Sequence, residues 1–335
     1  MVRLGAPGKT RLRQATSLDV GFAGAEANVA VSLAQYGMES EYITCLPYHP
    51  LADQCVERLR GYGVGVNNIF RGEGRMGTMY LETGSDVRPS RVYYDREHSL
   101  IADGCEGVFD WERILAGVDW FHWTGITPAL SAKAAAECKR AIEVARHLGV
   151  KVSCDVNYRS ALWRYGLQAS EVMPEMAEMC DMLIGNEEDF GKVFGITVEG
   201  FDAEHTGSSI EQGRFEEVCR RMVERFPQCQ RIATTLRGAN GADSNSWGGV
   251  LYTGGRFYQS TRYEIDHIVD RVGSGDSFAA GLIYGLSVFE NPQHILDFAV
   301  AASCLKHTIK GDFNLVSVGE VESLMRGNSS GRVVR

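Results

Sequence analysis

Short apolar runs alternate along most of the chain with longer segments that have helical spacing. Four runs have the length and composition of buried strands: 120–123, 151–155, 182–185 and 231–235. The stretch 131–147, between the first two, predicts a helix. Because strands that alternate with helices favour a parallel sheet covered on both faces, we predict an α/β, three-layer sandwich with a mostly parallel central sheet. Ligands of such sheets lie beyond the carboxyl ends of the strands, here near Asn157, Asn186 and Thr235.

One stretch breaks this alternation. Between residues 67 and 94, strand-like pieces follow one another without a helical segment between them. We therefore predict a single domain over 1–335 with a small β lid inserted, built from about 1–20 and 67–96. The polar run 203–209 predicts a surface loop.

The segment 270–281 carries the strongest chemical signal. Gly273 and Gly275 flank Ser274, Asp276 follows, and small and apolar residues then open a helix. The glycines allow successive N–H groups to point into one concavity, and the helix start adds its positive dipole end. This arrangement predicts an anion hole for a phosphoryl group, with Asp276 as the base that takes a proton from an attacking hydroxyl. The alternative is an ordinary capped helix after a glycine turn.

A second segment, 21–30, leads into another helical pattern that ends at Gly37. Its small residues, Gly24 among them, let a polar ligand approach the backbone, and the Asn28 amide can reach that ligand. Together with the downstream segment 270–281, this stretch resembles the two signatures of the ribokinase/PfkB family of sugar kinases. The resemblance implies a ribokinase-like fold, a sugar site at the first signature, and the anion hole and base at the second.

Three further segments, 77–81, 91–96 and 155–163, resemble the 2-keto-3-deoxygluconate kinases of this family. The resemblance implies an ATP-dependent transfer to the terminal hydroxyl of a keto-sugar acid. It also implies that the substrate is held by two tyrosines and two arginines: Tyr80, Tyr94, Arg96 and Arg159. Arginine suits a carboxylate, which it binds in a bidentate fork, whereas phenols suit hydroxyl and keto oxygens.

The same resemblance indicates the nucleotide side of the site. Asn186, Thr235 and Arg237, with Gly273 and Gly275, are the expected ATP-binding residues. Glu188 and Asp189 stand where the family has an acidic residue that helps to hold Mg²⁺ through water, so they are the candidate metal-site residues. The alternative is a solvated acidic helix start, which the helix dipole also favours. ATP, Mg²⁺ and a monovalent cation are the implied cofactors.

Composition limits the partners. A formal net charge of −9 argues against nucleic acid and anionic membranes, so the expected partners are a small sugar acid and ATP. The nine cysteines are scattered without a Cys-x-x-Cys pair, which is typical of reduced thiols. With no signal peptide or long apolar run, we expect a cytoplasmic protein. In this family lids also serve as dimer contacts, so a homo-oligomer through the lid is expected.

One departure from the family concerns the start of the chain. Family members begin with an apolar strand that forms the middle of the sheet, and the chain starts at 1–4, just after that point. A missing central strand would leave unpaired backbone groups in the sheet. Two alternatives therefore stay open beside the sugar-acid kinase: a kinase for a neutral sugar such as fructose or ribose, and a catalytically silent protein that binds a sugar acid.

Overall fold

The central sheet is built from the alternating strands that the sequence predicts. The structure, a computed structural model, describes residues 1–197, 212–239 and 241–327, and the predicted loop at 203–209 lies outside these residues. The strands of the sheet are β7 (Trp120–Thr124), β8 (Lys151–Asp155), β9 (Met182–Ile184), β10 (Arg231–Ala239), β11 (Ser244–Thr253), β12 (Arg256–Gln259) and β13 (Tyr263–Asp266). β7, β8, β9 and β10 run parallel, and the antiparallel strands β11, β12 and β13 extend the sheet beyond β10.

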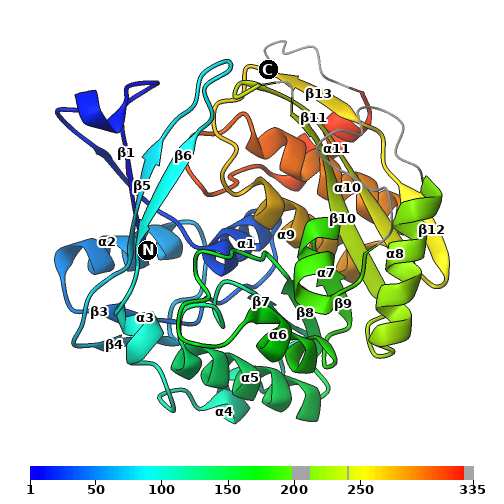
Figure 1. Cartoon of the computed structure of the whole chain (residues 1–335), viewed down its shortest axis with the longest axis horizontal. Helices are drawn as coiled ribbons and strands as arrows, with labels where there is room; N and C mark the ends of the chain where they lie inside the picture. Colours follow the sequence, from blue (N-terminus) through cyan, green and yellow to red (C-terminus); the bar gives the residue numbers. More distant parts are fainter. Residues whose placement is uncertain (198–211, 240, 328–335) are drawn as a thin grey trace.

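Helices cover both faces of this sheet, which confirms the predicted α/β sandwich (Figure 1). The helices are α1 (Ala25–Gln35), α2 (Pro50–Gly61), α3 (Leu100–Asp103), α4 (Trp111–Leu115), α5 (Ala132–His147), α6 (Ala169–Ala177), α7 (Glu187–Phe194), α8 (Gln212–Arg225), α9 (Ser274–Val288), α10 (Pro292–Lys306) and α11 (Val318–Met325), with a 3-10 turn, η1, at Leu12–Gln14.

Alternation along β9 shows how the layers form. Leu183 belongs to a core with α5, α6 and α8, whereas its neighbours Met182 and Ile184 belong to a second core with α1, α9 and α10. Successive side chains of a strand point to opposite faces, so each central strand stabilises both cores. The apolar runs that predicted buried strands therefore reflect burial on two sides.

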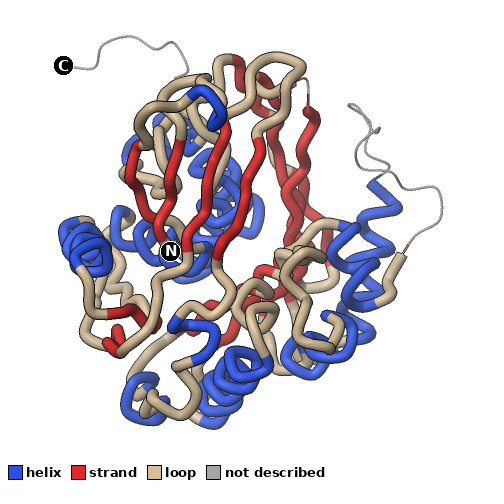
Figure 2. Tube along the Cα trace, turned by 60° about the vertical axis from the view of Figure 1, so that its left-hand side comes forward, coloured by secondary structure: helices blue, strands red, loops and turns tan. Residues whose placement is uncertain are grey.

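The lid is a separate four-stranded sheet in the order β2-β1-β5-β6. Its strands are β1 (Val2–Gly5), β2 (Asp19–Phe22), β5 (Thr78–Glu82) and β6 (Arg91–Asp95). Figures 1 and 2 show these strands standing beside the sandwich, on the side of the chain's N-terminus. One part of the expected lid range lies elsewhere, because β4 (Ile69–Gly72) pairs with β3 (Thr44–Pro47) in a small parallel sheet.

The β3–β4 pair is not joined to the central sheet. Among the described residues, β7 pairs only with β8, and β3 pairs only with β4. The Lys151 N–H donates to the Asp119 carbonyl, and the Gly125 N–H donates to the Asp155 carbonyl. In and around β7, the backbone groups of odd-numbered residues therefore point toward β8. The backbone groups of Trp120 and His122 therefore point away from it, toward a gap in the sheet. Within the described residues, the edge of β7 that faces away from β8 is therefore unpaired.

The cysteines differ from the prediction in one pair. Cys45 and Cys105 form a disulfide with a Cα–Cα distance of 6.2 Å, so the expectation of reduced thiols throughout is wrong for these two. The other seven cysteines are free and buried. The pairing joins β3 to the segment after α3, a contact that depends on tertiary structure and has no signature in the spacing. In the part of the chain that the structure describes, no helix has the length and apolar character needed to cross a membrane.

Candidate functional site

A cavity of about 1390 Å³ runs along the edge of β7 from Asp119, just before its amino end, and opens between the lid, the start of α9 and the carboxyl ends of β7, β8 and β9. This is the edge of the sheet where the sequence predicted ligand binding. The cavity brings together most of the predicted site residues from six separate regions of the chain: Gly24, Asn28, Tyr94, Arg96, Arg159, Asn186, Asp189, Thr235, Arg237, Gly273, Ser274, Gly275 and Asp276.

The anion hole forms at the first turn of α9. Gly273 precedes the helix with φ +87°, and a Cβ there would lie 2.1 Å from the carbonyl oxygen of Asp312, so only glycine fits. Gly275 lines the cavity, and nothing lies within 4 Å of the place where its Cβ would be. The Ser274 and Ser277 N–H groups bond the carbonyls of Arg271 and Gly273, whereas those of Gly275 and Asp276 have no acceptor inside the helix and can bind a ligand.

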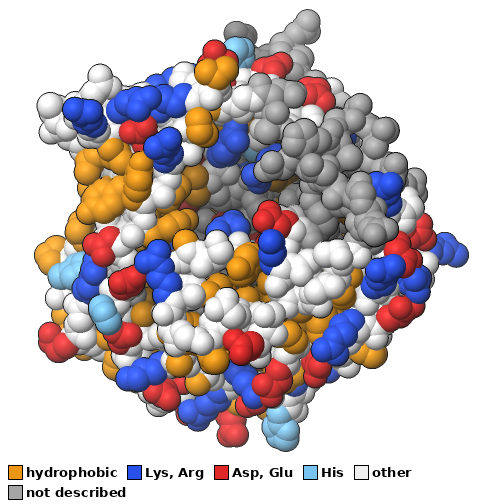
Figure 3. Space-filling view, in the orientation of Figure 1, with side chains coloured by type: hydrophobic (Ala, Val, Ile, Leu, Met, Phe, Trp, Pro, Cys, Tyr) orange, Lys and Arg blue, Asp and Glu red, His pale blue; other side chains and the backbone are white. Residues whose placement is uncertain are grey.

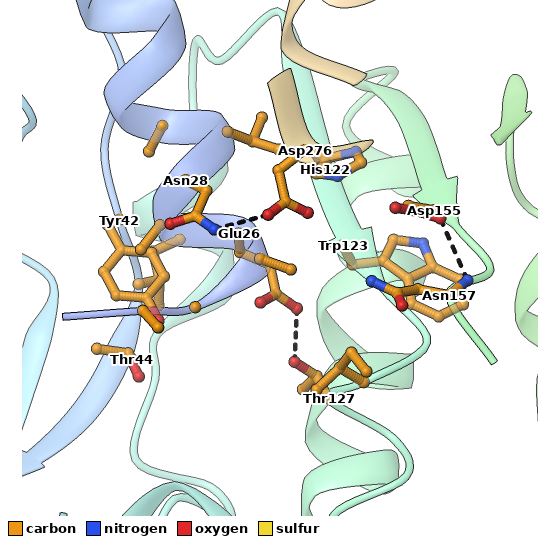
Figure 4. Close-up of a pocket in the computed structure, with 18 of the residues that line it drawn as sticks. Glu26, Asn28, Tyr42, Thr44, His122, Trp123, Thr127, Asp155, Asn157 and Asp276 are labelled. Carbon is orange, nitrogen blue, oxygen red and sulfur yellow. Dashed lines mark hydrogen bonds between the residues drawn. The ribbon is translucent and has the colours of Figure 1, made fainter. Parts of the chain in front are cut away.

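Asp276 lies at the same helix start, buried and held by one side chain. Asn28 Nδ2 donates a hydrogen bond of 2.6 Å to Asp276 Oδ2, which joins the two sequence signatures across the cavity (Figure 4). Burial raises the pKa of Asp276 to about 7, and the bond from Asn28 opposes that shift. A carboxyl group that titrates near neutrality can accept a proton and release it again under cellular conditions, as a general base requires.

The lid contributes Tyr94 and Arg96 from one side. The Arg96 guanidinium lies 4.5 Å from the centre of the Tyr94 ring, and its Nη2 donates to Met1 Sδ at 3.1 Å. The Arg96 Nε has no hydrogen-bond partner although it is buried, and burial lowers the pKa of this arginine. A buried cation without a carboxylate partner lacks the compensation that such groups usually have. An anionic ligand in the cavity would supply it.

Tyr80 does not join them. In the lid, Met79 pairs with Tyr94 and both line the cavity, whereas Tyr80 pairs with Tyr93 and neither does. Because alternate residues of a strand point to opposite faces, Tyr80 lies on the outer face of the lid. The structure therefore does not support the prediction that Tyr80 binds the substrate.

Arg159 follows β8, close to Asp155 at the end of that strand and to Asn157, which marked the predicted ligand edge of the sheet. The Asp155 carboxylate accepts a hydrogen bond of 3.2 Å from the N–H of Asn157, whose φ of +37° bends the chain toward the cavity (Figure 4). Burial, followed by the charges of Asp276 and Asp189, raises the pKa of Asp155, and Arg159 opposes the shift. Arg159 is thus the positive charge among three acidic groups, close to the proposed base.

Glu26 is a further site residue that sequence reasoning missed. It lies in the first signature and lines the cavity, where its Oε1 accepts hydrogen bonds from Thr124 at 2.8 Å and Thr127 at 2.7 Å (Figure 4). The bonds join α1 to the end of β7. Its place between Gly24 and Asn28 was the available signal, but the partners lie about a hundred positions along the chain and cannot be seen from that motif.

One of the two predicted metal residues, Asp189, also stabilises the start of a helix. Asn186 and Asp189 form a capping box at the start of α7, and the Asp189 carboxylate also accepts the N–H of Tyr158 at 3.1 Å. Both of its oxygens therefore have backbone partners, while Glu188 is exposed and does not line the cavity. Among the described residues, no group of three or more acidic, histidine or cysteine side chains could hold a metal ion. No preformed ion site is therefore present among these residues, and the role of Glu188 and Asp189 in holding Mg²⁺ through water stays a prediction.

The residues expected to bind ATP lie along one side of the cavity. Thr235 and Arg237 lie on β10 and line the cavity together with Asn186. The Arg237 guanidinium is 5.2 Å from the ring centre of the buried Trp247, which holds this exposed side chain at the wall. The whole arrangement can bind an anion at the start of α9, deprotonate a hydroxyl at Asp276 and pair a second anion with Arg96.

Comparison with known proteins gives one consistent picture. The family model for pfkB family carbohydrate kinases matches residues 4–315. The crystal structure of a 2-dehydro-3-deoxygluconokinase from Thermotoga maritima superposes with a TM-score of 0.92 at 44% identity, and the match covers 98% of this chain and 97% of that one. A 2-dehydro-3-deoxygalactonokinase from Haloferax volcanii is 30% identical over 99% of this chain and 96% of its own length. A 2-dehydro-3-deoxygluconokinase from Thermoproteus tenax is 26% identical over 97% and 92%.

Proposed function

Because the chain belongs to the pfkB family of carbohydrate kinases, we propose that it transfers a phosphoryl group from ATP to the terminal hydroxyl of 2-keto-3-deoxygluconate. The observation that carries the proposal is the buried pair of Asn28 and Asp276 at the open start of α9. It combines a base that titrates near neutrality with an anion hole. The enzyme class, a phosphotransferase with an alcohol acceptor, is that of its relatives.

Each part of the reaction falls to a residue that lines the cavity. Asp276 takes the proton of the attacking hydroxyl, and the N–H groups of the first turn of α9 hold the transferring phosphoryl group. Arg96 binds the carboxylate at the other end of the substrate, and Tyr94 lies beside it. In-line transfer then requires that the hydroxyl end of the substrate stay at Asp276 while its carboxylate end stays at Arg96. The start of α9 and the lid can hold the two ends in these positions.

The finer assignments are part of the same proposal. Asn186, Thr235 and Arg237 line the wall available to ATP. Mg²⁺ arrives with the nucleotide, since Glu188 and Asp189 supply no preformed site. Arg159 stays a substrate-binding candidate at the Asp276 end of the cavity. We further propose a single kinase domain that works in the cytoplasm.

A substrate panel tests the proposal. ATP consumption is measured with 2-keto-3-deoxygluconate, its C4 epimer 2-keto-3-deoxygalactonate, fructose and ribose. The proposal expects kcat/KM to be highest for a keto-sugar acid, with the neutral sugars at least about 10-fold lower, as the loss of a charge-assisted contact requires. A preference for fructose or ribose would make the protein a neutral-sugar kinase. Sugar-acid binding without any turnover would make it a silent homologue.

We also propose that the protein self-associates through the outer face of the lid. One row of apolar side chains crosses all four strands there: Val20, Leu4, Tyr80 and Tyr93. Val20 and Tyr93 are exposed, and Figure 3 shows hydrophobic side chains gathered over the lid. Exposed apolar strands of this kind are usually covered by a partner. Tyr93→Lys should therefore shift the mass in solution to that of a monomer, whereas Val87→Lys, at an exposed site outside the row, should not.

A further inference from the structure

One buried charge close to the anion hole has no role in the reaction described above. Lys306, the last residue of α10, has no exposed surface. Its ammonium group donates to the backbone carbonyl of Ile309 at 3.2 Å and to that of Asp270 at 3.4 Å. A fully buried lysine is rare, and it requires partners that compensate for the water it has lost.

These partners belong to two loops that meet under the anion hole. Asp270 begins the loop that leads to Gly273, and its side chain also accepts the N–H groups of Gly311 and Val272, each at 3.1 Å. The Lys306 Cε is 3.3 Å from the position of a Cβ on Gly273. The ammonium thus lies behind the glycine that shapes the anion hole, at the junction of residues 270–273 with residues 309–312.

The charges around Lys306 favour its protonated form. Burial lowers the pKa of Lys306 and Arg3 adds to that shift, while Asp270, Asp312 and Asp276 oppose it. Arg3 pairs with both Asp270 and Asp312, so the junction holds three carboxylates against two fixed cations. Removing the lysine would leave backbone carbonyls and carboxylates facing one another without enough positive charge.

Backbone carbonyls turned toward one point are the usual ligands of a monovalent cation. An ammonium group is a compact positive charge that can take the place of such a cation. We propose that Lys306 is a built-in monovalent cation that holds the anion-hole loop in position, so that phosphoryl transfer by this protein needs no added K⁺. Lys306 is a positioning residue, because it acts through Gly273 and does not line the cavity. The inference rests on the proposed kinase function for its activity readout only.

The first experiment uses the unmodified protein. Its phosphorylation rate is measured with K⁺, Na⁺ or the bulky tetramethylammonium ion as the only monovalent cation. If Lys306 supplies the charge, the rates in the three cations should agree within about twofold, because the added ions then act only by screening exposed charges. Activation by K⁺ of about 10-fold or more would overturn the proposal, since it would mean that an ion and not the lysine fills the role.

The second experiment removes the charge. Lys306→Ala should lower kcat by about 10-fold or more in tetramethylammonium, and K⁺ or methylammonium should restore much of it by entering the vacated space. Lys310→Ala is the matched control, because Lys310 is exposed and pairs with Asp19 at the surface. A full rate in Lys306→Ala, or a loss that no small cation restores while the fold persists, would contradict the proposal.

A third readout does not depend on turnover. Amide exchange over 270–276 and 309–312 should quicken in Lys306→Ala and slow again when K⁺ is added, with α5 unchanged. If the unmodified protein phosphorylates no sugar acid, the proposed function fails, but this comparison still decides the role of Lys306. If Lys306→Ala does not fold, the cation dependence of the unmodified protein remains decisive.

Discussion

Asp276 combines two properties that a general base needs, a raised pKa and a fixed position. Asn28 holds one carboxylate oxygen at 2.6 Å and leaves the other for a hydroxyl group. Asp276→Asn keeps the shape and an oxygen for the Asn28 bond but cannot take a proton, so kcat should fall by about 10²–10⁴-fold. Steady-state kinetics at saturating ATP check this. A rate near that of the unmodified protein would mean that Asp276 is not the base.

The same carboxyl group predicts a pH dependence of stability. Its folded pKa is raised from 3.8 to about 7, so the folded state binds this proton more tightly than the unfolded state. The stabilisation is present at low pH and is lost as the pH rises toward 7, up to a limit of about 4 kcal/mol. Asp276→Asn should therefore gain free energy of unfolding relative to the unmodified protein at pH 8 and little at pH 4. Urea unfolding of both proteins at pH 4 and pH 8 measures this gain. The same difference in free energy of unfolding at the two pH values would contradict the prediction.

Arg96 should decide the choice between acid and neutral sugars. Its Nε has no partner among the described residues, and a carboxylate would supply one, a contact of about 1.5–3 kcal/mol. Arg96→Ala should thus raise the KM for 2-keto-3-deoxygluconate by about 10- to 150-fold and change the KM for fructose far less. Arg91→Ala, at the exposed start of β6, the strand that Arg96 follows, is the control. Equal losses on both substrates would make Arg96 a structural residue.

At the scale of elements, a buried arginine of the lid pairs with both loops beside the anion hole, 270–273 and 309–312. Arg3 on β1 bridges the buried carboxylates of Asp270 and Asp312, on either side of the anion hole. Removing one partner of a buried ion pair leaves the others uncompensated, so Arg3→Met should lower the free energy of unfolding by about 3–5 kcal/mol. Arg13→Met, at an exposed site of the lid, should change it little. Chemical denaturation compares them, and similar values for the two variants would show that the bridge is weak.

The lid also shows what a sequence pattern can and cannot predict about an element. The absence of helical spacing between residues 67 and 94 predicted strands, and β5 and β6 are strands. The same pattern does not say which face of a strand points to the substrate. Tyr80 and Tyr94 were both expected in the cavity, but the register pairs Tyr94 with Met79 and leaves Tyr80 on the outer face. A register shift of one residue would move the side chains of a strand to the opposite face, and the register is set only by the packing of the folded protein.

At the scale of the whole molecule, the parts that could be predicted are those with local signatures. Gly273 to Asp276, Asn28 and the strands from β7 to β10 each have a pattern within a few residues. The roles of Glu26 and Lys306 could not be predicted, although Glu26 lies within a motif, because they depend on partners far away in the chain, such as Thr127 and Asp270. The position of Asp189 was predicted, but its two bonds to backbone N–H groups exist only once β8 and α7 are in place.

The gap beside β7 should be visible in the exchange of its amide hydrogens. The N–H groups of Trp120 and His122 point toward the cavity, whereas those of Phe121 and Trp123 point toward β8 and belong to the ladder. Unpaired strand amides exchange without any opening of the sheet, so Trp120 and His122 should exchange roughly 100-fold faster or more than Phe121 and Trp123. The four residues share one strand, so each pair is the control for the other. Equal protection at all four, measured by residue-resolved NMR, would show that another segment covers this edge in solution and that the sheet is continuous there.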